Sequence, residues 1–295
     1  MTDDSKPSYS SDVDEFRRVL SASHNIVVIT GAGLSAASGI PTFRTGNGLW
    51  QTHDVASLAT PDAFASNPVL VWQFYHERRR TVLTASPNPA HYALAVLSLP
   101  SYLQTVAPSC AQFTIVTQNV DGLSTRAYKE VVSRHSNGTP DPVLYPPNLF
   151  EMHGRLLDTL CTGCGHRERN DADPLCAALG RAMKPEEMEG ISVEDLPHCL
   201  RCGGLLRPGV VWFEEIPHHL REIRQVVEST DLCLVIGTSS TVYPAAGYAH
   251  DVAERGGTVA VFNIERPQED EVADFFFQGP CEQTLPAILL GCDST

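Results

Sequence analysis

The sequence predicts an α/β fold in which helices cover both faces of a parallel, Rossmann-like sheet. Short runs of β-branched and apolar residues recur along the chain, and each run ends in small or polar residues. Helical segments separate these runs, and strands connected in this way form a parallel sheet. A glycine-rich loop directly follows the first run, as in sheets that bind a ligand beyond their strand ends. The predicted strands are residues 25–30, 113–117, 232–236 and 259–262.

Two regions interrupt this alternation and predict a second, smaller domain. Residues 45–105 have mainly helical character, and residues 156–207 contain paired cysteines but little continuous apolar sequence. A bound metal would have to supply the stability that this second region lacks. We also expect a first helix over residues 13–20 and a surface loop over 133–148. The expected large, Rossmann-like domain consists of residues 13–44, 106–155 and 208–295, and the small domain combines a helical module (45–105) with a zinc module (156–207).

Charge and composition argue against several classes of function. The 295 residues carry a formal net charge of −14, which repels nucleic-acid backbones and attracts basic protein segments. The sequence has no run of about 18 apolar residues, so we expect no membrane span. Its first residues lack the features of a secretory signal or a transit peptide. We therefore expect a cytoplasmic or nuclear protein, with mitochondria as the alternative location, and we expect a monomer.

The glycine loop has the spacing of a phosphate-binding turn. Gly31-Ala32-Gly33-Leu34-Ser35-Ala36 places Gly-x-Gly-x-x-Ala between a strand and an expected helix, where backbone N–H groups can approach a pyrophosphate. A tight turn without a ligand is the alternative interpretation. A dehydrogenase would continue to a second strand that ends in an acidic residue about 20 positions on. Residues 38–44 do not continue in this way, which argues against hydride transfer.

Two Cys-x-x-Cys pairs predict one structural zinc ion. Cys161 and Cys164 form the first pair, and Cys199 and Cys202 form the second. Four thiolates suit tetrahedral zinc, and a site with four protein ligands has no open position at which to activate water. A histidine near either pair, His166 or His198, is the alternative ligand.

Together these segments resemble the motifs of the sirtuins, a family of NAD-dependent protein lysine deacylases. The resemblance begins at the glycine loop, continues through the cysteine pairs and follows the order of the family's motifs. It is carried by residues 31–44, Gln118-Asn119-Val120-Asp121-Gly122-Leu123, Glu151-Met152-His153-Gly154, Gly237-Thr238-Ser239-Ser240 and Phe262-Asn263-Ile264-Glu265.

The resemblance implies a reaction that consumes NAD and acyl-lysine and yields nicotinamide, O-acyl-ADP-ribose and free lysine. His153 would be the catalytic base, although a lone histidine is otherwise more often a hydrogen-bonded core residue. Asn119 and Asp121 would act with it on the nicotinamide side, and Gln118 would bind the ribose. Phe43 would cover the nicotinamide pocket and Arg44 would order its loop. The remaining implied NAD-binding residues are Gly31, Ala32, Gly33, Ser35, Ala36, Thr42, Gly237, Thr238, Ser239, Asn263, Glu265 and Cys281, with plain packing as the alternative for Cys281.

A Tyr-x-x-Arg pair indicates which acyl group is removed. Tyr75 and Arg78 lie three residues apart on a predicted helix and share one face, where they could bind a carboxylate together. The pair, with Ala59, resembles that of the class III sirtuins, which remove succinyl, malonyl and glutaryl groups. The simpler alternative is a solvated, charged helix face. We expect Arg79 and Arg80 to face solvent.

The resemblance also places the protein substrate. A peptide containing the acyl-lysine would add as a strand between Val211-Trp212-Phe213 and the segment at Tyr243. Glu214 departs from the family pattern, because glycine is usual at this position. Three alternative functions stay open at this point: a general deacetylase or decrotonylase, an ADP-ribosyltransferase, and a non-catalytic NAD-binding module.

Overall fold

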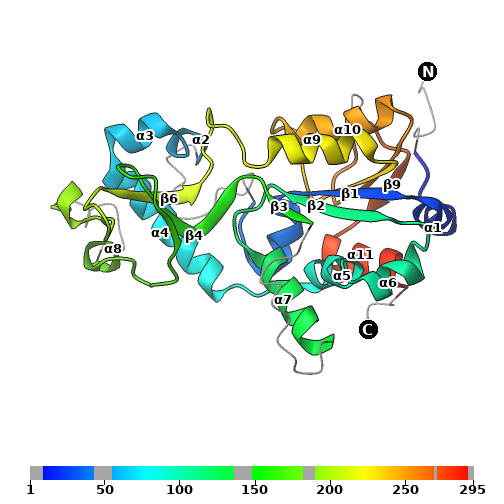
Figure 1. Ribbon diagram of the computed structural model, residues 1–295, viewed down its shortest axis with the longest axis horizontal. Coiled ribbons are helices and arrows are strands. Elements are labelled where there is room, and N and C mark those ends of the chain that lie inside the picture. Colours follow the sequence, from blue (N-terminus) through cyan, green and yellow to red (C-terminus); the bar gives the residue numbers. More distant parts are fainter. Residues whose placement is uncertain (1–8, 43–54, 136–147, 182–189, 269–270, 292–295) are drawn as a thin grey trace, which may run out of the picture.

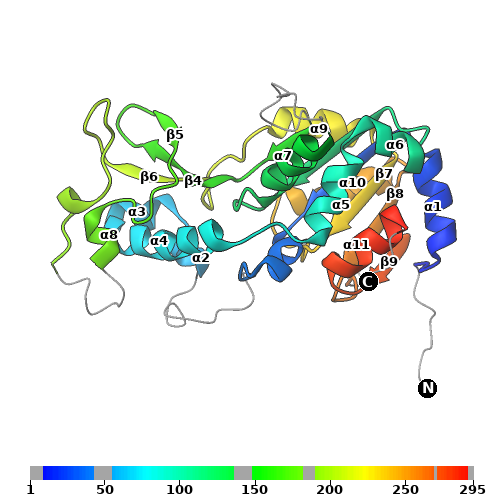
Figure 2. The same cartoon turned by 90° about the horizontal axis from the view of Figure 1, so that it is seen from below.

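A computed structural model describes residues 9–42, 55–135, 148–181, 190–268 and 271–291. Figure 1 shows a large sheet with helices above and below it, and a smaller part with its own sheet at the other end of the molecule. Figure 2 shows the same two parts from below, with α2 and α4 beside the small sheet. Among the described residues, no helix has the length and apolar character needed to cross a membrane.

The large sheet has six strands in the order β3-β2-β1-β7-β8-β9, and every neighbouring pair is parallel. The four predicted strands are confirmed to within one residue at either end. The prediction missed β3 and β9, which have only three and four residues. The strands are β1 (Asn25–Thr30), β2 (Gln112–Thr117), β3 (Leu149–Glu151), β7 (Leu232–Ile236), β8 (Thr258–Asn263) and β9 (Phe275–Gln278).

Helices bury both faces of this sheet, as predicted. Ile26 and Val28 of β1 pack into one core, whereas Val27 and Ile29 pack into the core on the opposite face. The first core is covered by α1 (Val13–Ala22), α5 (Pro89–Leu97), α6 (Pro100–Val106) and α11 (Cys281–Leu290), and α7 (Leu123–His135) packs against α5. The second is covered by α9 (Leu220–Ser229) and α10 (Ala245–Glu254). Successive strand residues point to opposite faces, and both faces are buried. The strands are therefore continuous apolar runs in the sequence, as the prediction assumed.

The small part combines a three-stranded antiparallel sheet with short helices. Trp72 is fully buried at its centre, and its indole N–H donates to Leu206 O at 2.7 Å, which joins a helix to the sheet. The sheet has the order β5-β4-β6. Its elements are β4 (Gly154–Cys161), β5 (Arg167–Arg169), β6 (Leu206–Val210), α2 (Val55–Leu58), α3 (Pro61–Ser66), α4 (Pro68–Thr84) and α8 (Ala177–Arg181).

Contacts in the structure separate the helices of residues 45–105 into two groups. Helices α2, α3 and α4 contribute to the core of the small part, whereas α5 and α6 contribute Leu94, Leu97 and Leu103 to the core of the large sheet. We therefore propose that the helical module ends near Ser86 rather than at residue 105. The expected loop over 133–148 lies largely outside the described residues.

Arg79 corrects a second expectation, because its side chain is 1% exposed. Its guanidinium donates to Leu156 O at 3.0 Å and to Asn170 O at 2.6 Å, so it joins α4 to the small sheet. A guanidinium has five fixed donors and can satisfy several carbonyl oxygens at once, which explains how this charge is accommodated. Arg80 is half-exposed beside Asp173, as expected.

Candidate active site

The two glycine segments meet where the large sheet reverses its strand order. Strands β1 and β7 are neighbours, and the chain leaves them toward opposite edges of the sheet. Gly33 N–H donates to Gly237 O at 2.7 Å. A Cβ atom on Gly31 would lie 2.7 Å from Thr238 Cβ, and one on Gly33 would lie 2.7 Å from Gly237 Cα. The glycines are therefore required by the close approach of two loops, and this N–H of the loop is already bonded within the protein.

The expected helix is present as a short 3₁₀ helix, η1 (Ala32–Ser38), which begins within the glycine loop itself. It ends at Gly39, whose φ of 81° lies in the left-handed region that glycine adopts readily. Ser35, on its inner side, is fully buried. Its hydroxyl donates to Asp121 Oδ2 at 2.7 Å. The turn thus brings a hydroxyl group to the residues that follow β2.

A polar cluster joins η1 to the segment after β2. Asn119 Nδ2 donates to Gly31 O at 3.0 Å and lies 3.1 Å from Ser35 Oγ. Asp121 is buried and accepts from Leu123 N–H at 2.8 Å, and burial raises the pKa of its carboxyl group. The geometry thus brings together three of the predicted residues, although they lie up to 86 positions apart in sequence.

His91 belongs to this cluster, and the sequence analysis missed it. Its Nε2 lies 3.3 Å from Ser35 Oγ, and burial lowers its pKa to about 4, so the ring is neutral at physiological pH. His91 lies on α5 among alanines and leucines, where nothing in the sequence distinguishes it from a core histidine.

The ends of β2, β7 and β8 are joined at Thr238. Gln118 Nε2 donates to Thr238 Oγ1 at 3.2 Å, and Asn263 Nδ2 donates to Thr238 O at 3.0 Å. Ser239 lies beside this residue with its hydroxyl 2.9 Å from Thr241 Oγ1, and Glu265 is exposed. Cys281 is buried under β8, with its sulfur 3.9 Å from Phe262 O, so its side chain packs in the core. Phe43 and Arg44 lie outside the described residues, and Thr42 is the last residue before that gap.

His153 lies on the turn between β3 and β4, and its orientation is fixed. Its Nδ1 atom lies 3.1 Å from Gln118 O. Because a carbonyl oxygen can only accept, Nδ1 carries the hydrogen and Nε2 is left as the basic nitrogen. Burial lowers the pKa of His153, and the nearby His218 lowers it further. A neutral imidazole with one free nitrogen is suited to accept a proton.

Two backbone hydrogen bonds and one glycine hold this turn in place. Val211 N–H donates to His153 O at 2.8 Å, and His218 N–H donates to Met152 O at 2.8 Å. Gly154 has a φ of 76°, and a Cβ atom there would lie 2.4 Å from Gly209 O. The turn therefore requires glycine at this position for both conformational and steric reasons.

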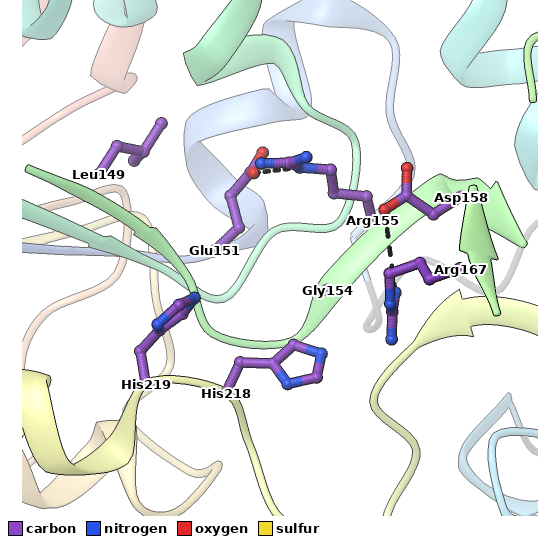
Figure 3. A pocket seen from close by; sticks show the side chains of 8 residues that line it. All are labelled: Leu149, Glu151, Gly154, Arg155, Asp158, Arg167, His218 and His219. Atoms are coloured by element: carbon purple, nitrogen blue, oxygen red, sulfur yellow. Dashed lines mark hydrogen bonds and ion pairs between the residues drawn. The ribbon is translucent and has the colours of Figure 1, made fainter. Parts of the chain in front are cut away.

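A cavity of about 300 Å³ lies beside the turn, and Figure 3 shows the side chains around it. Glu151 forms an ion pair with Arg155 and also accepts from Thr125 Oγ1 at 3.1 Å, so this pair spans the turn that carries His153. Neither His153 nor any predicted NAD-binding residue that the structure describes lines the cavity. It is lined by Leu149, Glu151, Gly154, Arg155, Asp158, Arg167, His218 and His219.

Four of the predicted substrate residues are joined in pairs in the small part. Trp212 Nε1 donates to the Tyr75 hydroxyl oxygen at 3.0 Å, and Phe213 N–H donates to Ala59 O at 2.9 Å. Tyr75 is buried, and burial raises its pKa to about 12. Its hydroxyl is therefore neutral, and because the oxygen accepts from Trp212, its own proton is directed elsewhere.

Arg78 lies half-buried on the same helix, with its guanidinium carbon 4.3 Å from the centre of the Phe74 ring. Burial lowers the pKa of Arg78. The sequence analysis missed a second arginine here: Arg207 stacks 3.5 Å above the Trp212 ring and forms an ion pair with Glu215. Only its place beside the tryptophan in three dimensions identifies it.

Tyr243 and Glu214 lie at the surface. Tyr243 is 77% exposed. Glu214 is also exposed and has a φ of 72°, which explains why glycine suits this position.

The four cysteines form a cluster that fits one zinc ion. All four sulfur atoms lie within 4.8 Å of one another, with Cys161 and Cys202 at 3.4 Å and Cys164 and Cys199 at 3.8 Å. Tetrahedral zinc with bonds of about 2.3 Å places its sulfur ligands roughly 3.8 Å apart. Neither of the two alternative ligands, His166 and His198, belongs to this group of four metal-ligating side chains among the described residues.

Comparisons with known proteins agree with this arrangement. The Sir2 family matches residues 31–244. The chain is 44% identical to the mitochondrial NAD-dependent protein deacylase sirtuin-5 of Xenopus tropicalis, over 94% of this chain and 85% of that protein. It is 41% identical to an NAD-dependent protein deacylase of Pyrococcus abyssi, over 93% and 96% of the two chains. The crystal structure of a Sir2 homologue in complex with NAD superimposes with a TM-score of 0.76 at 31% identity, over 96% of this chain and 95% of that one.

Proposed function

The chain belongs to the Sir2 family and is an NAD-dependent protein deacylase, and we propose that it removes succinyl, malonyl and glutaryl groups from lysine. The observation that carries the acyl preference is the pair formed by Tyr75 and Arg78 on α4. The proposed products are nicotinamide, O-acyl-ADP-ribose and free lysine.

In open parallel sheets, ligands bind beyond the strand ends where the strand order reverses, which here is the region beyond β1 and β7. We call this region the crevice and propose that it binds NAD. It presents amide and hydroxyl groups from Ser35, Gln118 and Asn119, which can bond ribose hydroxyls and a carboxamide. NAD supplies the activated ribose that takes up the acyl oxygen as nicotinamide leaves. We propose that Asn119 and Asp121 orient the nicotinamide side, and that Thr238, Asn263 and Glu265 hold the adenosine half.

We assign the base to His153. Its Nδ1–H is held by Gln118 O, so Nε2 can take the proton of a ribose hydroxyl. Because its pKa is lowered, the ring stays neutral at pH values where an unperturbed histidine would be protonated. The zinc cluster takes no part in this proton transfer, because its four ligands leave no open position.

The acyl pocket is suited to a carboxylate. Tyr75 can donate the proton that it does not use toward Trp212, and Arg78 can add two parallel donors from the same face of α4. Ala59 offers a small side chain that packs against the same core as Tyr75. A neutral acetyl group cannot form this charge-assisted pair with Arg78, which favours succinyl over acetyl.

Acyl-lysine proteins or peptides are the proposed partners. A peptide strand would lie along Val211, Trp212 and Phe213 and reach the exposed Tyr243. The Xenopus tropicalis relative is named as a mitochondrial protein, which supports mitochondria over the cytoplasm or nucleus for this chain as well. We also propose that the protein is a monomer.

The test compares succinyl-lysine and acetyl-lysine on one peptide, with and without NAD, in wild type and in Arg78→Met. We expect an NAD-dependent preference for succinyl, and a roughly 10- to 100-fold loss of that preference in the variant because a charge-assisted pair is removed. Arg80→Met is the matched control, since Arg80 lies two residues away and is half-exposed. Equal rates on both peptides in wild type would overturn the acyl assignment, and NAD label retained on protein would instead indicate ADP-ribosyl transfer.

A further inference from the structure

The turn that follows β6 is rigid, and Glu214 is its outermost charged residue. Glu215 N–H donates to Trp212 O at 3.1 Å, and the Glu215 carboxylate accepts from Trp212 N–H at 2.8 Å. Arg207 holds the same carboxylate at 2.8 Å and stacks on the Trp212 ring. The backbone on both sides of Glu214 is thereby fixed, so its side chain leaves the turn in a defined direction.

Glu214 itself makes no such contact. It is exposed, and no described residue forms a hydrogen bond or ion pair with its carboxylate. Its backbone has a φ of 72°, where a residue with a Cβ atom is disfavoured. A carboxylate here therefore adds nothing to the stability of the turn, and its placement invites a functional explanation.

The turn lies close to the base. Val211 N–H bonds His153 O, and Glu214 follows three residues later, at most about 10 Å along the chain. An acyl-lysine that reaches the reaction centre has its own backbone about 6 Å away, at the other end of the lysine side chain. With the peptide added along residues 211–213, as proposed above, the residues that flank the acyl-lysine pass within reach of Glu214.

The surroundings of Glu214 suit a basic side chain. Phe213 on one side is 41% exposed, and Ile216 on the other is 81% exposed. The aliphatic stem of a lysine or arginine can lie along such apolar surface while its head reaches a carboxylate. The net charge of −14 attracts the same segments from a distance.

We propose that Glu214 is a specificity-determining residue that favours substrates with lysine or arginine next to the acyl-lysine. The inference rests on the proposed deacylase function. It is independent of the acyl group, because Glu214 selects the flanking residues whereas Tyr75 and Arg78 contact the acyl chain.

The experiment uses matched peptides that carry arginine, glutamine or glutamate beside the acyl-lysine. Wild type, Glu214→Gln and Glu214→Lys are compared, and all three keep a side chain at the same backbone position. For charges about 6 Å apart in water we expect an effect of about threefold per charge on KM, with kcat unchanged. The preference for arginine should disappear in Glu214→Gln, reverse in Glu214→Lys, and weaken at about 0.5 M salt.

Glu222→Gln is the control, because Glu222 is an exposed carboxylate on α9. It should keep the wild-type preference. An identical flank preference in wild type, Glu214→Gln and Glu214→Lys would overturn the proposal. Glu214→Gly removes the side chain and relieves the unfavourable φ, and it should show the same lack of preference as Glu214→Gln. If only Glu214→Gly loses the preference for arginine, the effect comes from backbone geometry and not from the carboxylate.

Each series is run on both succinyl-lysine and acetyl-lysine. A flank preference that depends on Glu214 with either acyl group supports this inference even if the acyl assignment fails. If the enzyme prefers one acyl group but shows no preference for the residue beside the acyl-lysine, the inference about Glu214 is overturned and the acyl assignment stands.

Discussion

The crevice beside the large sheet and the proposed acyl pocket of the small part are built in different ways. In the crevice, the functional residues follow the carboxyl ends of parallel strands, and they bond mainly one another and backbone atoms, as Asn119 does with Gly31. In the acyl pocket, Tyr75 comes from a helix and Trp212 from a segment after an edge strand, and a side-chain contact joins them. Strand topology thus forms the first site, whereas the second depends on packing and a metal cluster.

This difference implies that the two sites respond differently to damage. The crevice is supported by two large apolar cores, one on each face of a six-stranded sheet. The small part, over its described residues, has one core, a three-stranded sheet and four cysteines whose sulfur atoms lie together. A perturbation that spares the large sheet can therefore eliminate acyl-lysine binding completely.

Loss of zinc is expected to have the largest effect. Binding of zinc to four thiolates is worth roughly 10–16 kcal/mol in small zinc domains, which is as large as the stability of a whole domain. Chelation or Cys199→Ser should unfold residues 156–207 and abolish deacylation of every acyl-lysine, and the large sheet should keep its hydrogen-exchange protection.

The measurement is metal content together with site-resolved hydrogen exchange and activity. Cys176→Ser is the control, because Cys176 lies in the same region but outside the cluster. If zinc is removed without any change in hydrogen exchange or in the deacylation rate, the zinc has no structural role.

Replacement of Asp121 is expected to have the next largest effect, and it should act on the other site. Asp121→Asn keeps the size of the side chain but removes the buried charge, so kcat/KM should fall about 100-fold or more. Burial raises the pKa of this carboxyl group in the fold, so its ionised form costs stability at neutral pH. The variant should therefore be as stable as wild type or more so, and its advantage should shrink as the pH falls.

Thermal unfolding and steady-state kinetics across pH test this expectation. Asp62→Asn, on the exposed first turn of α3, is the control and should change neither quantity. A variant that loses activity because it melts much earlier than wild type would show that Asp121 acts in folding rather than in the reaction.

The sequence predicts the crevice well because topology places its residues. Once the strands were recognised from their apolar runs, Gly31, Asn119 and Gly237 had to lie at one edge of the sheet. The zinc ligands could also be predicted, because the two cysteines of each pair are only three residues apart in the sequence. Short strands such as β3 and β9 escaped notice because three or four residues do not form a recognisable pattern.

Contacts made through side chains across the fold could not be predicted. In the sequence, Arg79 is one of three consecutive arginines. In the structure it is buried, and it donates to the carbonyl oxygens of Leu156 and Asn170. His91 and Arg207 likewise gain their roles only through Ser35 and Trp212, which lie far away in sequence. In each case the decisive quantity is the burial of a polar group, and burial depends on the assembled fold.

His218 gives the smallest predicted effect, because it acts on the base from outside the crevice. Its backbone N–H holds Met152 O, and its side chain lines the cavity beside the turn. Burial lowers the pKa of His218, so it is positively charged only at the acid end of the pH range, where its charge lowers the pKa of His153. In His218→Gln the backbone bond is kept and the charge is lost, so the pKa of His153 should rise. A base with a higher pKa stays protonated to a higher pH, and the acid limb of kcat/KM should therefore move to higher pH by a few tenths of a unit.

Rates measured between about pH 5 and 9 with saturating NAD resolve such a shift. His250→Gln, on the exposed side of α10, is the control. The plateau at high pH should not change, because His153 is then neutral in both proteins and His218 carries no charge. An acid limb that stays in place, or that moves to lower pH, would show that the cavity and the base are electrostatically independent. The turn would then couple the two sides of the site through its backbone alone.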